Sequence, residues 1–270
     1  MYVPPAEVVE QATQLGEKKV ALSLKDMGVR GFLAAALLGY ATALAFYAAA
    51  VTQSPLVGAL VFPAGFVMLS LLGLELVTGN FALLLLPLFR RRTHLVAILR
   101  NWVVVYVAHI LGGLLLAYMV YVAWTFNGQR LDDPWVQRLV DITHSKTLAY
   151  AKMGAQGWWV AFVKAVLCNW MVTLAAFLGL AARDTAGKII AMWLPIFTFF
   201  ALGFEHSVVN LFLIPAGMMM GASITAGDWW LWNQIPVTIG NIVGGALFTA
   251  GLLHWTYGSA ALEGQETKSS

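Results

Sequence analysis

A glutamate and a histidine, Glu205 and His206, stand side by side within an apolar stretch that runs from residue 189 past residue 220. A charged side chain in hydrocarbon is costly, so ionisable residues within such stretches are rare and usually functional. Histidine changes its charge near physiological pH, and it can therefore give a hydrogen bond or a proton to a small anion. The pair favours a contact between His206 and a passing anion, and a hydrogen-bonded core histidine is the alternative.

A second polar interruption lies earlier in the chain, where Gly73, Glu75, Thr78 and Gly79 occur within another long apolar stretch. Thr78 either donates its hydroxyl to a passing anion or caps the helix that follows. We interpret Glu75 and Glu205 as structural groups, each accepting hydrogen bonds from the backbone N–H groups of its own broken turn. A role for the two glutamates in relaying protons is the alternative.

The composition indicates which elements position these residues. The chain has 270 residues, of which 60% are apolar and 11% charged, and its mean hydropathy is +0.76. Apolar stretches long enough to cross a bilayer core of about 30 Å recur along almost the whole length. We predict an all-α membrane protein with six transmembrane helices over residues 29–52, 57–89, 95–126, 156–182, 187–221 and 234–257. The second and fifth are too long for one plain helix, and they contain the two polar interruptions.

Lysine and arginine orient these helices, because cytoplasmic loops carry an excess of them. Eleven lie on the side of the N-terminus and four on the opposite side. Both termini are therefore expected on the cytoplasmic side of the cytoplasmic membrane. We divide the chain into an amphipathic N-terminal helix over residues 1–28, a channel domain over 29–258 and a polar tail over 259–270.

The two halves of the sequence repeat the same landmarks. Glu75 precedes an asparagine by five residues, as does Glu205, and Asn101 precedes a Gly-Gly pair by eleven residues, as does Asn233. Three predicted helices separate the copies, so the second copy crosses the membrane in the opposite sense. Inverted repeats with broken helices at matching positions indicate a transport site near the bilayer midplane. The half-helix N-termini that meet there attract anions.

Bulky apolar side chains lie within about three helical turns of the breaks, namely Phe62, Phe66 and Phe199. They are candidates for constrictions that exclude water and larger ions, and ordinary core or lipid-facing phenylalanines are the alternative. A weak acid that takes up a proton would cross such a constriction at a lower electrostatic cost than its anion.

Several segments together resemble the formate/nitrite transporter family, whose members carry small monovalent anions. They are GFEHSVVNLFLIPAG at 203–217, IPVTIGNIVGG at 235–245, ELVTGN at 75–80, LRNW at 99–102 and AVLCNW at 165–170. The resemblance extends across all six predicted helices. It implies an aquaporin-like fold and a homopentamer in which each protomer has its own pore.

The resemblance also implies roles for individual residues. His206 matches the central pore histidine, and Thr78 matches its partner on the mobile loop of the second helix. Asn169 matches the pore asparagine of the fourth helix, and Lys152 matches a basic residue that attracts anions to the outer vestibule. The inner constriction would consist of Leu76 and Val172, and the outer one of Phe62, Phe66 and Phe199.

The sequence departs from the family pattern in places. Phe66 stands where a leucine is frequent and His109 where an asparagine is frequent, two changes that would narrow or retune the pore. The spacing from Lys152 to Asn169 differs by about one residue from that in some formate channels. The family resemblance suggests formate as the first candidate substrate, nitrite as the second and hydrosulfide as the third.

Other classes of membrane protein fit less well. A redox subunit would need paired axial ligands for haem, and no two of His109, His206 and His254 share a predicted helix at ligand spacing. A water or neutral-solute channel would normally contain two Asn-Pro-Ala motifs, and the sequence has neither. No nucleophile stands with a base and an orienting acid, and the lone Cys168 excludes an intrachain disulfide. We predict no enzyme activity, cofactor, metal site or nucleic-acid partner.

Overall fold

Four helices in the described part of the chain are long and apolar enough to cross a membrane. The computed structural model describes residues 2–258, so the predicted polar tail over 259–270 lies outside the described residues. The four are α2 (Leu24–Thr52), α7 (Leu95–Thr125), α10 (Ala155–Ala181) and a last helix over Ala226–Gly258. The last helix begins with α13 (Ala226–Trp229), the π-helical η1 (Trp230–Gln234), α14 (Ile235–Val243) and the π-helical η2 (Gly244–Gly251), and it continues as α-helix over residues 252–258.

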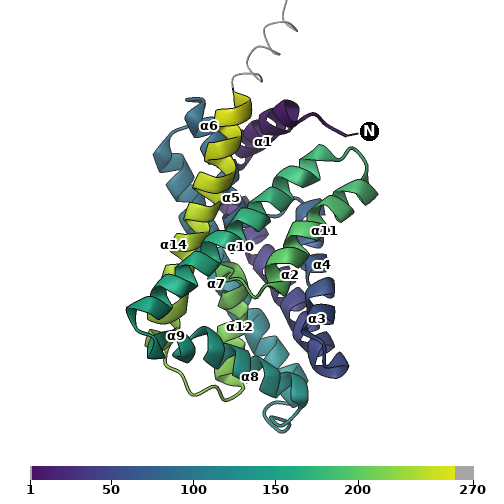
Figure 1. The fold of residues 1–270 in the computed structure, drawn as a ribbon, viewed down its shortest axis with the longest axis vertical. Helices are drawn as coiled ribbons and strands as arrows, with labels where there is room; N and C mark the ends of the chain where they lie inside the picture. The colour runs from purple at the N-terminus through teal and green to yellow at the C-terminus, as the bar shows by residue number, and fades with distance from the viewer. Residues whose placement is uncertain (1, 259–270) are drawn as a thin grey trace, which may run out of the picture.

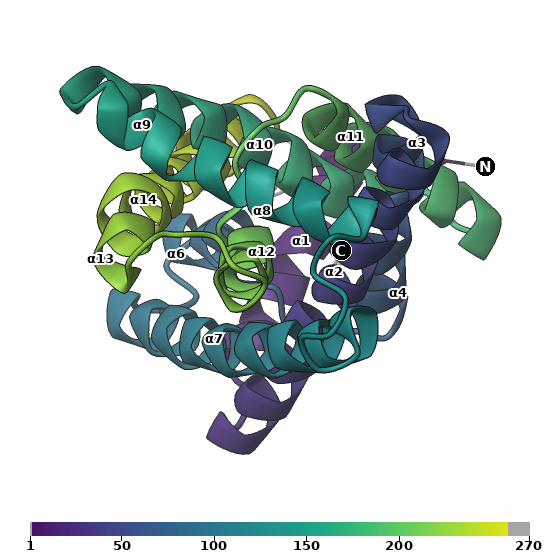
Figure 2. The same ribbon diagram turned by 90° about the horizontal axis from the view of Figure 1, so that it is seen from below.

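The predicted spans over 57–89 and 187–221 are divided into shorter helices. The first contains α3 (Pro55–Val61), α4 (Pro63–Leu71), α5 (Val77–Leu83) and α6 (Leu85–Phe89), and the second contains α11 (Thr185–Ala201) and α12 (Ser207–Met219). Non-helical residues at 72–76 and 202–206 interrupt them, where the polar residues of the sequence predicted a break. Figure 2 shows α12 in the middle of the bundle, between α7 and α8.

Both interruptions begin with the same backbone motif. Gly73 (φ +63°) and Gly203 (φ +67°) adopt left-handed conformations. The amide of Leu74 then bonds to the carbonyl of Leu69 at 2.9 Å, and the equivalent bond after Gly203 is 3.1 Å long. This is the Schellman ending, which glycine favours because it has no Cβ. A Cβ built on either glycine would have no neighbour within 4 Å, so the conformation alone requires glycine at these positions.

Small residues let the long helices pack closely in pairs. A Cβ on Gly112 of α7 would lie 2.3 Å from the carbonyl oxygen of Phe32 on α2. A Cβ on Gly244 would lie 2.4 Å from the carbonyl oxygen of Val166 on α10. Close approach of backbones through glycine is the usual way in which membrane helices associate. The Gly-Gly pairs that repeat in the sequence therefore mark matching helix contacts in the two halves.

Two amphipathic helices cover opposite ends of the bundle (Figure 1). Helix α1 (Pro5–Val20) buries a stripe that includes Val9 and Ala12 at one end. Helix α8 (Pro134–Lys146), with the short α9 (Leu148–Lys152) after it, lies at the other end. The apolar pattern of the sequence does not predict α8, whose Leu139 is fully buried.

Charged side chains attach α1 to the loop that follows α6. The Glu10 carboxylate pairs with the guanidinium of Arg90 and lies 3.3 Å from that of Arg92. Burial by itself would raise the pKa of Glu10, but a hydrogen bond from Gln14 and the charges of the arginines outweigh it. The pKa of Glu10 therefore lies below its ordinary value.

Candidate substrate pore

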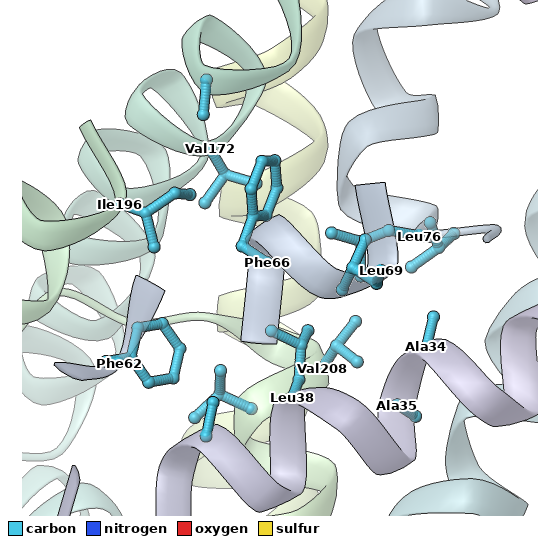
Figure 3. Close-up of a cluster of buried hydrophobic side chains, with 14 of the residues drawn as sticks. Ala34, Ala35, Leu38, Phe62, Phe66, Leu69, Leu76, Val172, Ile196 and Val208 are labelled. Carbon is cyan, nitrogen blue, oxygen red and sulfur yellow. The ribbon is translucent and has the colours of Figure 1, made fainter. Parts of the chain in front are cut away.

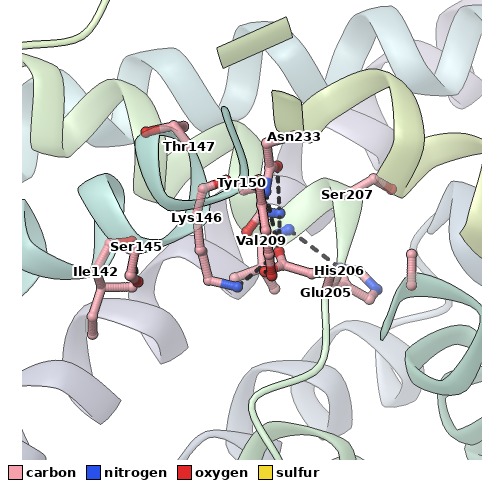
Figure 4. Close-up of polar contacts among 12 residues, drawn as sticks. Ile142, Ser145, Lys146, Thr147, Tyr150, Glu205, His206, Ser207, Val209 and Asn233 are labelled. Atoms are coloured by element: carbon pink, nitrogen blue, oxygen red, sulfur yellow. Dashed lines mark hydrogen bonds and ion pairs between the residues drawn. The ribbon is translucent and has the colours of Figure 1, made fainter. Parts of the chain in front are cut away.

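Glu205 is buried, with 1% of its surface exposed, in a cluster of side-chain donors at the break before α12 (Figure 4). The Lys146 ammonium lies 2.8 Å from Oε2, and the Tyr150 hydroxyl donates to Oε1 at 2.8 Å. Asn210 and Asn233 both donate to Oε2, at 2.9 and 3.2 Å. Asn233 also donates to the Lys146 carbonyl at 3.0 Å. These bonds make a buried carboxylate tolerable within the membrane.

Glu75 occupies a cluster of the same design at the break before α5. The Lys19 ammonium, from the end of α1, lies 2.6 Å from Oε1. Asn80 donates to Oε2 at 2.8 Å, and it also donates to Asn101 Oδ1 at 2.9 Å. Asn101 in turn donates to the Lys19 carbonyl at 3.3 Å. The asparagines that repeat in the sequence are thus the partners of the two glutamates.

The predicted partners of the two glutamates were wrong, although their structural role fits the contacts. Both carboxylates accept hydrogen bonds from side chains, and not from the backbone N–H groups of the broken turns as predicted. The N–H groups have other acceptors: that of Ser207 bonds to Asn241 Oδ1 at 2.8 Å, and that of Val77 bonds to His109 Nε2 at 3.0 Å. A lysine from a distant helix gives the charge compensation that a backbone dipole lacks.

His206 and Thr78 meet between the two breaks. The His206 Nε2 and Thr78 Oγ1 atoms are 3.0 Å apart, and both residues are buried. His206 Nδ1 accepts a hydrogen bond from the amide of Val209 at 3.2 Å. An amide can only donate, so Nδ1 carries no hydrogen and the hydrogen of a neutral ring is on Nε2, directed at Thr78. The sequence placed these two residues on different helices, and the structure brings them together.

Apolar side chains surround this polar contact. All five predicted constriction residues belong to one buried cluster and are no more than 5% exposed: Phe62, Phe66, Leu76, Val172 and Phe199. Figure 3 shows Phe66 and Val172 close together, with Phe62 below them. The Phe199 ring stacks on the His206 ring with centroids 5.8 Å apart, and it meets Phe62 edge to face at 5.7 Å.

Two cavities reach the breaks from opposite ends. The α8 cavity has a volume of about 510 Å³ and is lined by Lys146, Phe199 and His206, among others. The α1 cavity has a volume of about 270 Å³ and is lined by Phe66 and Leu76, among others. Phe66 therefore lies on the Leu76 side of the apolar cluster, whereas the resemblance grouped it with Phe62 and Phe199.

The basic residues of the α8 cavity differ from the one that the sequence singled out. Lys152 is exposed and does not line the cavity, whereas Arg138, Lys146 and Lys164 do. Lys146 is neutralised by Glu205, but Arg138 and Lys164 form no ion pair with a described residue. Arg138 Nε is buried without a hydrogen-bond partner. A lone lysine within an apolar stretch was the signal that could have identified Lys164.

Asn169 ties the first break to the last helix. Its side-chain amide donates to the Thr78 carbonyl at 3.0 Å and to the Asn241 carbonyl at 2.6 Å. Its Oδ1 is buried without a partner among the described residues. This oxygen is a hydrogen-bond acceptor close to the His206–Thr78 contact, so it can receive a donor such as water or a protonated acid.

Two of the three candidate haem ligands, His109 and His206, are engaged in hydrogen bonds that do not suit haem ligation. Both ring nitrogens of His206 have partners, and those of His109 contact the Val77 amide and the Gly31 carbonyl. Within residues 2–258, no three His, Cys, Asp or Glu side chains gather as metal ligands would.

A model of the formate/nitrite transporter family matches residues 6–256 of the chain. The chain belongs to the formate/nitrite transporter family. It is 37% identical over 273 residues to a probable formate transporter of Methanothermobacter thermautotrophicus, covering 95% of this chain and 97% of that one. It is 30% identical over 268 residues to the formate channel FocA of Haemophilus influenzae, covering 88% and 90% of the two chains.

Solved structures show the same fold. An FNT family ion channel superposes with a TM-score of 0.78 at 25% identity, covering 93% of this chain and 98% of that one. A pentameric formate channel with formate bound superposes with a TM-score of 0.68 at 24% identity, over 86% and 96% of the two chains. This family member is thus an all-helical membrane protein whose relatives are channels and transporters.

Proposed function

We propose that this family member carries formate across the cytoplasmic membrane through a pore centred on His206 and Thr78. The observation that carries the proposal is their 3.0 Å contact, enclosed by apolar side chains and approached by a cavity from each end. Formate channels and transporters among the relatives support this choice of substrate. Nitrite is the second candidate, because the family model covers both anions, and hydrosulfide is a further comparison.

The hydrogen-bond directions suggest how the contact handles an anion. His206 Nε2 donates to Thr78 Oγ1, which leaves the hydroxyl hydrogen of Thr78 available to a formate oxygen. Formate that takes up a proton supplied by the solution becomes a neutral acid, which crosses the apolar cluster at a far lower desolvation cost than the anion. The unpartnered Asn169 Oδ1 can accept the hydrogen bond of that acid.

Electrostatic attraction at the α8 end comes from Arg138 and Lys164 in this proposal. Three cations and one carboxylate line the α8 cavity, so two positive charges are in excess there. Lys152, the predicted attractor, is exposed outside the cavity, where solvent screens its charge. An anion entering from this end would meet Arg138 and Lys164 before it reaches His206.

The proposal extends to topology and assembly. The chain would cross the membrane six times, in two inverted repeats of three helices with an aquaporin-like fold. The matching clusters around Glu75 and Glu205 support this arrangement. The excess of basic residues on the α1 side supports cytoplasmic termini. A homopentamer with one pore per protomer is supported by the likeness to a pentameric formate channel.

Flux into proteoliposomes tests the proposed function. Formate, nitrite and hydrosulfide are compared at pH 5 and pH 8 with the unaltered protein, Thr78→Val and Thr78→Ser. Serine keeps the hydroxyl and valine keeps the shape without it, so formate flux should survive in Thr78→Ser and fall by about tenfold or more in Thr78→Val. Equal flux in both variants would refute the role of the hydroxyl, and preferred nitrite flux would change the substrate.

His206 is tested in the same assay. Replacing it with leucine removes the donor to Thr78 and should alter the dependence of flux on pH. Unchanged flux at both pH values would refute a part for His206 in transport. An absence of flux for every anion with the unaltered protein would refute the proposed function itself.

A further inference from the structure

His109 makes two directed hydrogen bonds at the first break. It is fully buried in α7, and its Nδ1 lies 2.7 Å from the carbonyl oxygen of Gly31 on α2. Its Nε2 accepts a hydrogen bond from the amide of Val77 at 3.0 Å. A carbonyl only accepts and an amide only donates, so the ring is neutral with its hydrogen on Nδ1. His109 thus ties the first residue of α5 to α2.

Asn241 makes the equivalent tie at the second break. Its Oδ1 accepts from the amide of Ser207, the first residue of α12, at 2.8 Å. Its Nδ2 donates to the Ala165 carbonyl on α10 at 2.8 Å. The first amide after each break is therefore held by one side chain that is also anchored on a long helix. The acceptor is an imidazole nitrogen at the first break and an amide oxygen at the second.

The two breaks differ in how many further ties they have. The Glu205 carbonyl accepts a second bond from Asn241 at 3.0 Å, and the Ser207 carbonyl accepts one from Gln234 at 3.2 Å. At residues 75–77 of the first break, the bond from the Val77 amide to His109 is the one hydrogen bond between a backbone group and a side chain among the described residues. Loss of His109 would therefore free the Val77 amide and leave this segment held by the bond from Asn169 to the Thr78 carbonyl at 3.0 Å, whereas the second break would keep several ties.

We infer that His109 is a positioning residue that fixes Leu76 and Thr78 in the pore without touching the substrate. Val77 lies between these two residues, so its amide controls where both side chains point. Without this bond the backbone can turn about the remaining Asn169–Thr78 contact, which would direct the Thr78 hydroxyl away from His206 and shift Leu76 within the apolar cluster. This inference rests on the proposed function for its flux readout, but it also makes predictions about the protein that are independent of transport.

Variants of His109 separate the tie from general packing. His109→Asn can supply an acceptor and a donor as Asn241 does, whereas His109→Leu and His109→Phe supply neither. Leu116→Ala is the control, because Leu116 is buried in the same helix within a different apolar cluster. Two quantities are measured: hydrogen exchange of the peptide that contains Val77, and formate flux in proteoliposomes.

The expected result is that exchange at Val77 accelerates by about tenfold in His109→Leu and His109→Phe, because a buried amide without an acceptor opens readily. Formate flux should change in the same two variants. His109→Asn should restore both slow exchange and flux, and Leu116→Ala should change neither. Unchanged exchange in the leucine or phenylalanine variant, or an asparagine variant that behaves like them, would overturn the inference.

The ring itself gives a test that needs no variant. Nitrogen chemical shifts of labelled His109 in the unaltered protein should identify a neutral ring with its hydrogen on Nδ1. A charged ring or a hydrogen on Nε2 would overturn the inference even if the apolar variants do not fold. If the unaltered protein shows this ring and protected Val77 but carries no anion, the proposed function fails and the tie stands.

Discussion

The ion pair between Glu205 and Lys146 offers a sharp test of how this protein tolerates charge within the membrane. Removing one partner of a buried pair usually costs about 3–5 kcal/mol of folding free energy, because the other charge is left uncompensated. The two partners are not equally buried: the side chain of Glu205 is 1% exposed and that of Lys146 is 15% exposed. The cost should therefore depend on which partner is removed.

Glu205→Gln leaves an ammonium that can turn toward the water of the α8 cavity, which Lys146 lines. Asn210 keeps its bond to Asn233 at 2.8 Å. We expect this variant to cost about 3 kcal/mol, the lower end of the range. Lys146→Met leaves a carboxylate that cannot reach solvent, so we expect about 4–5 kcal/mol. The double variant should recover about 2–3 kcal/mol relative to the sum of the singles.

The free energy of unfolding is measured in mixed micelles by titration with a denaturing detergent, with tryptophan fluorescence as the signal. Lys152→Met is the matched control, because Lys152 is exposed and its loss should cost no more than about 0.5 kcal/mol. A larger loss of unfolding free energy in Glu205→Gln than in Lys146→Met, or a loss below about 1 kcal/mol in both, would refute a buried ion pair whose cost depends on burial. Normal stability with a selective loss of flux in Glu205→Gln would instead favour a proton relay.

Three further predictions concern the cations of the α8 cavity, the docking of α1 and the left-handed Gly203. Arg138→Gln and Lys164→Gln should slow formate entry several-fold at low salt and less at high salt, because salt screens these charges. Lys152→Gln should have little effect on formate flux at either salt concentration. Because the pKa of Glu10 is lowered, its ion pairs stabilise the docked α1 above about pH 4.5, and this contribution is lost as the pH falls through the lower folded-state pKa. A spin label on α1 should become mobile at that low pH, and in Glu10→Gln it should already be mobile at pH 7. A label that stays immobile in both cases would contradict this prediction. Gly203→Ala should lower the unfolding free energy by about 1–2 kcal/mol, because its φ is +67°, and an unchanged value would show that the turn is not needed.

The broken helices and their glutamates could be found from the sequence, because local patterns encode them. A glycine followed by an acid within a long apolar stretch indicates a break, and Gly73 and Gly203 both adopt the left-handed conformation that ends the helix. The repeat of Glu75 and Asn80 as Glu205 and Asn210 showed that the two breaks match. These features depend on neighbours within a few residues, which a single sequence displays.

The partners of those residues could not be found in the same way, because they come from distant parts of the chain. Lys146 reaches Glu205 from α8, a helix that the apolar pattern of the sequence does not predict. The expected backbone donors were replaced by side chains, and Lys152 was preferred to Arg138 and Lys164, since spacing alone does not show which basic residue faces the cavity.

The sequence by itself determined the membrane-spanning class of this protein, the position of its two breaks and the family to which it belongs. Composition and short motifs depend only on the order of the residues in the chain, so the sequence alone displays them. Only the tertiary structure decided that His206 donates to Thr78 and that His109 holds Val77. A hydrogen bond needs two atoms within about 3 Å at a suitable angle, and residues more than 30 positions apart meet that condition only when the helices between them are packed.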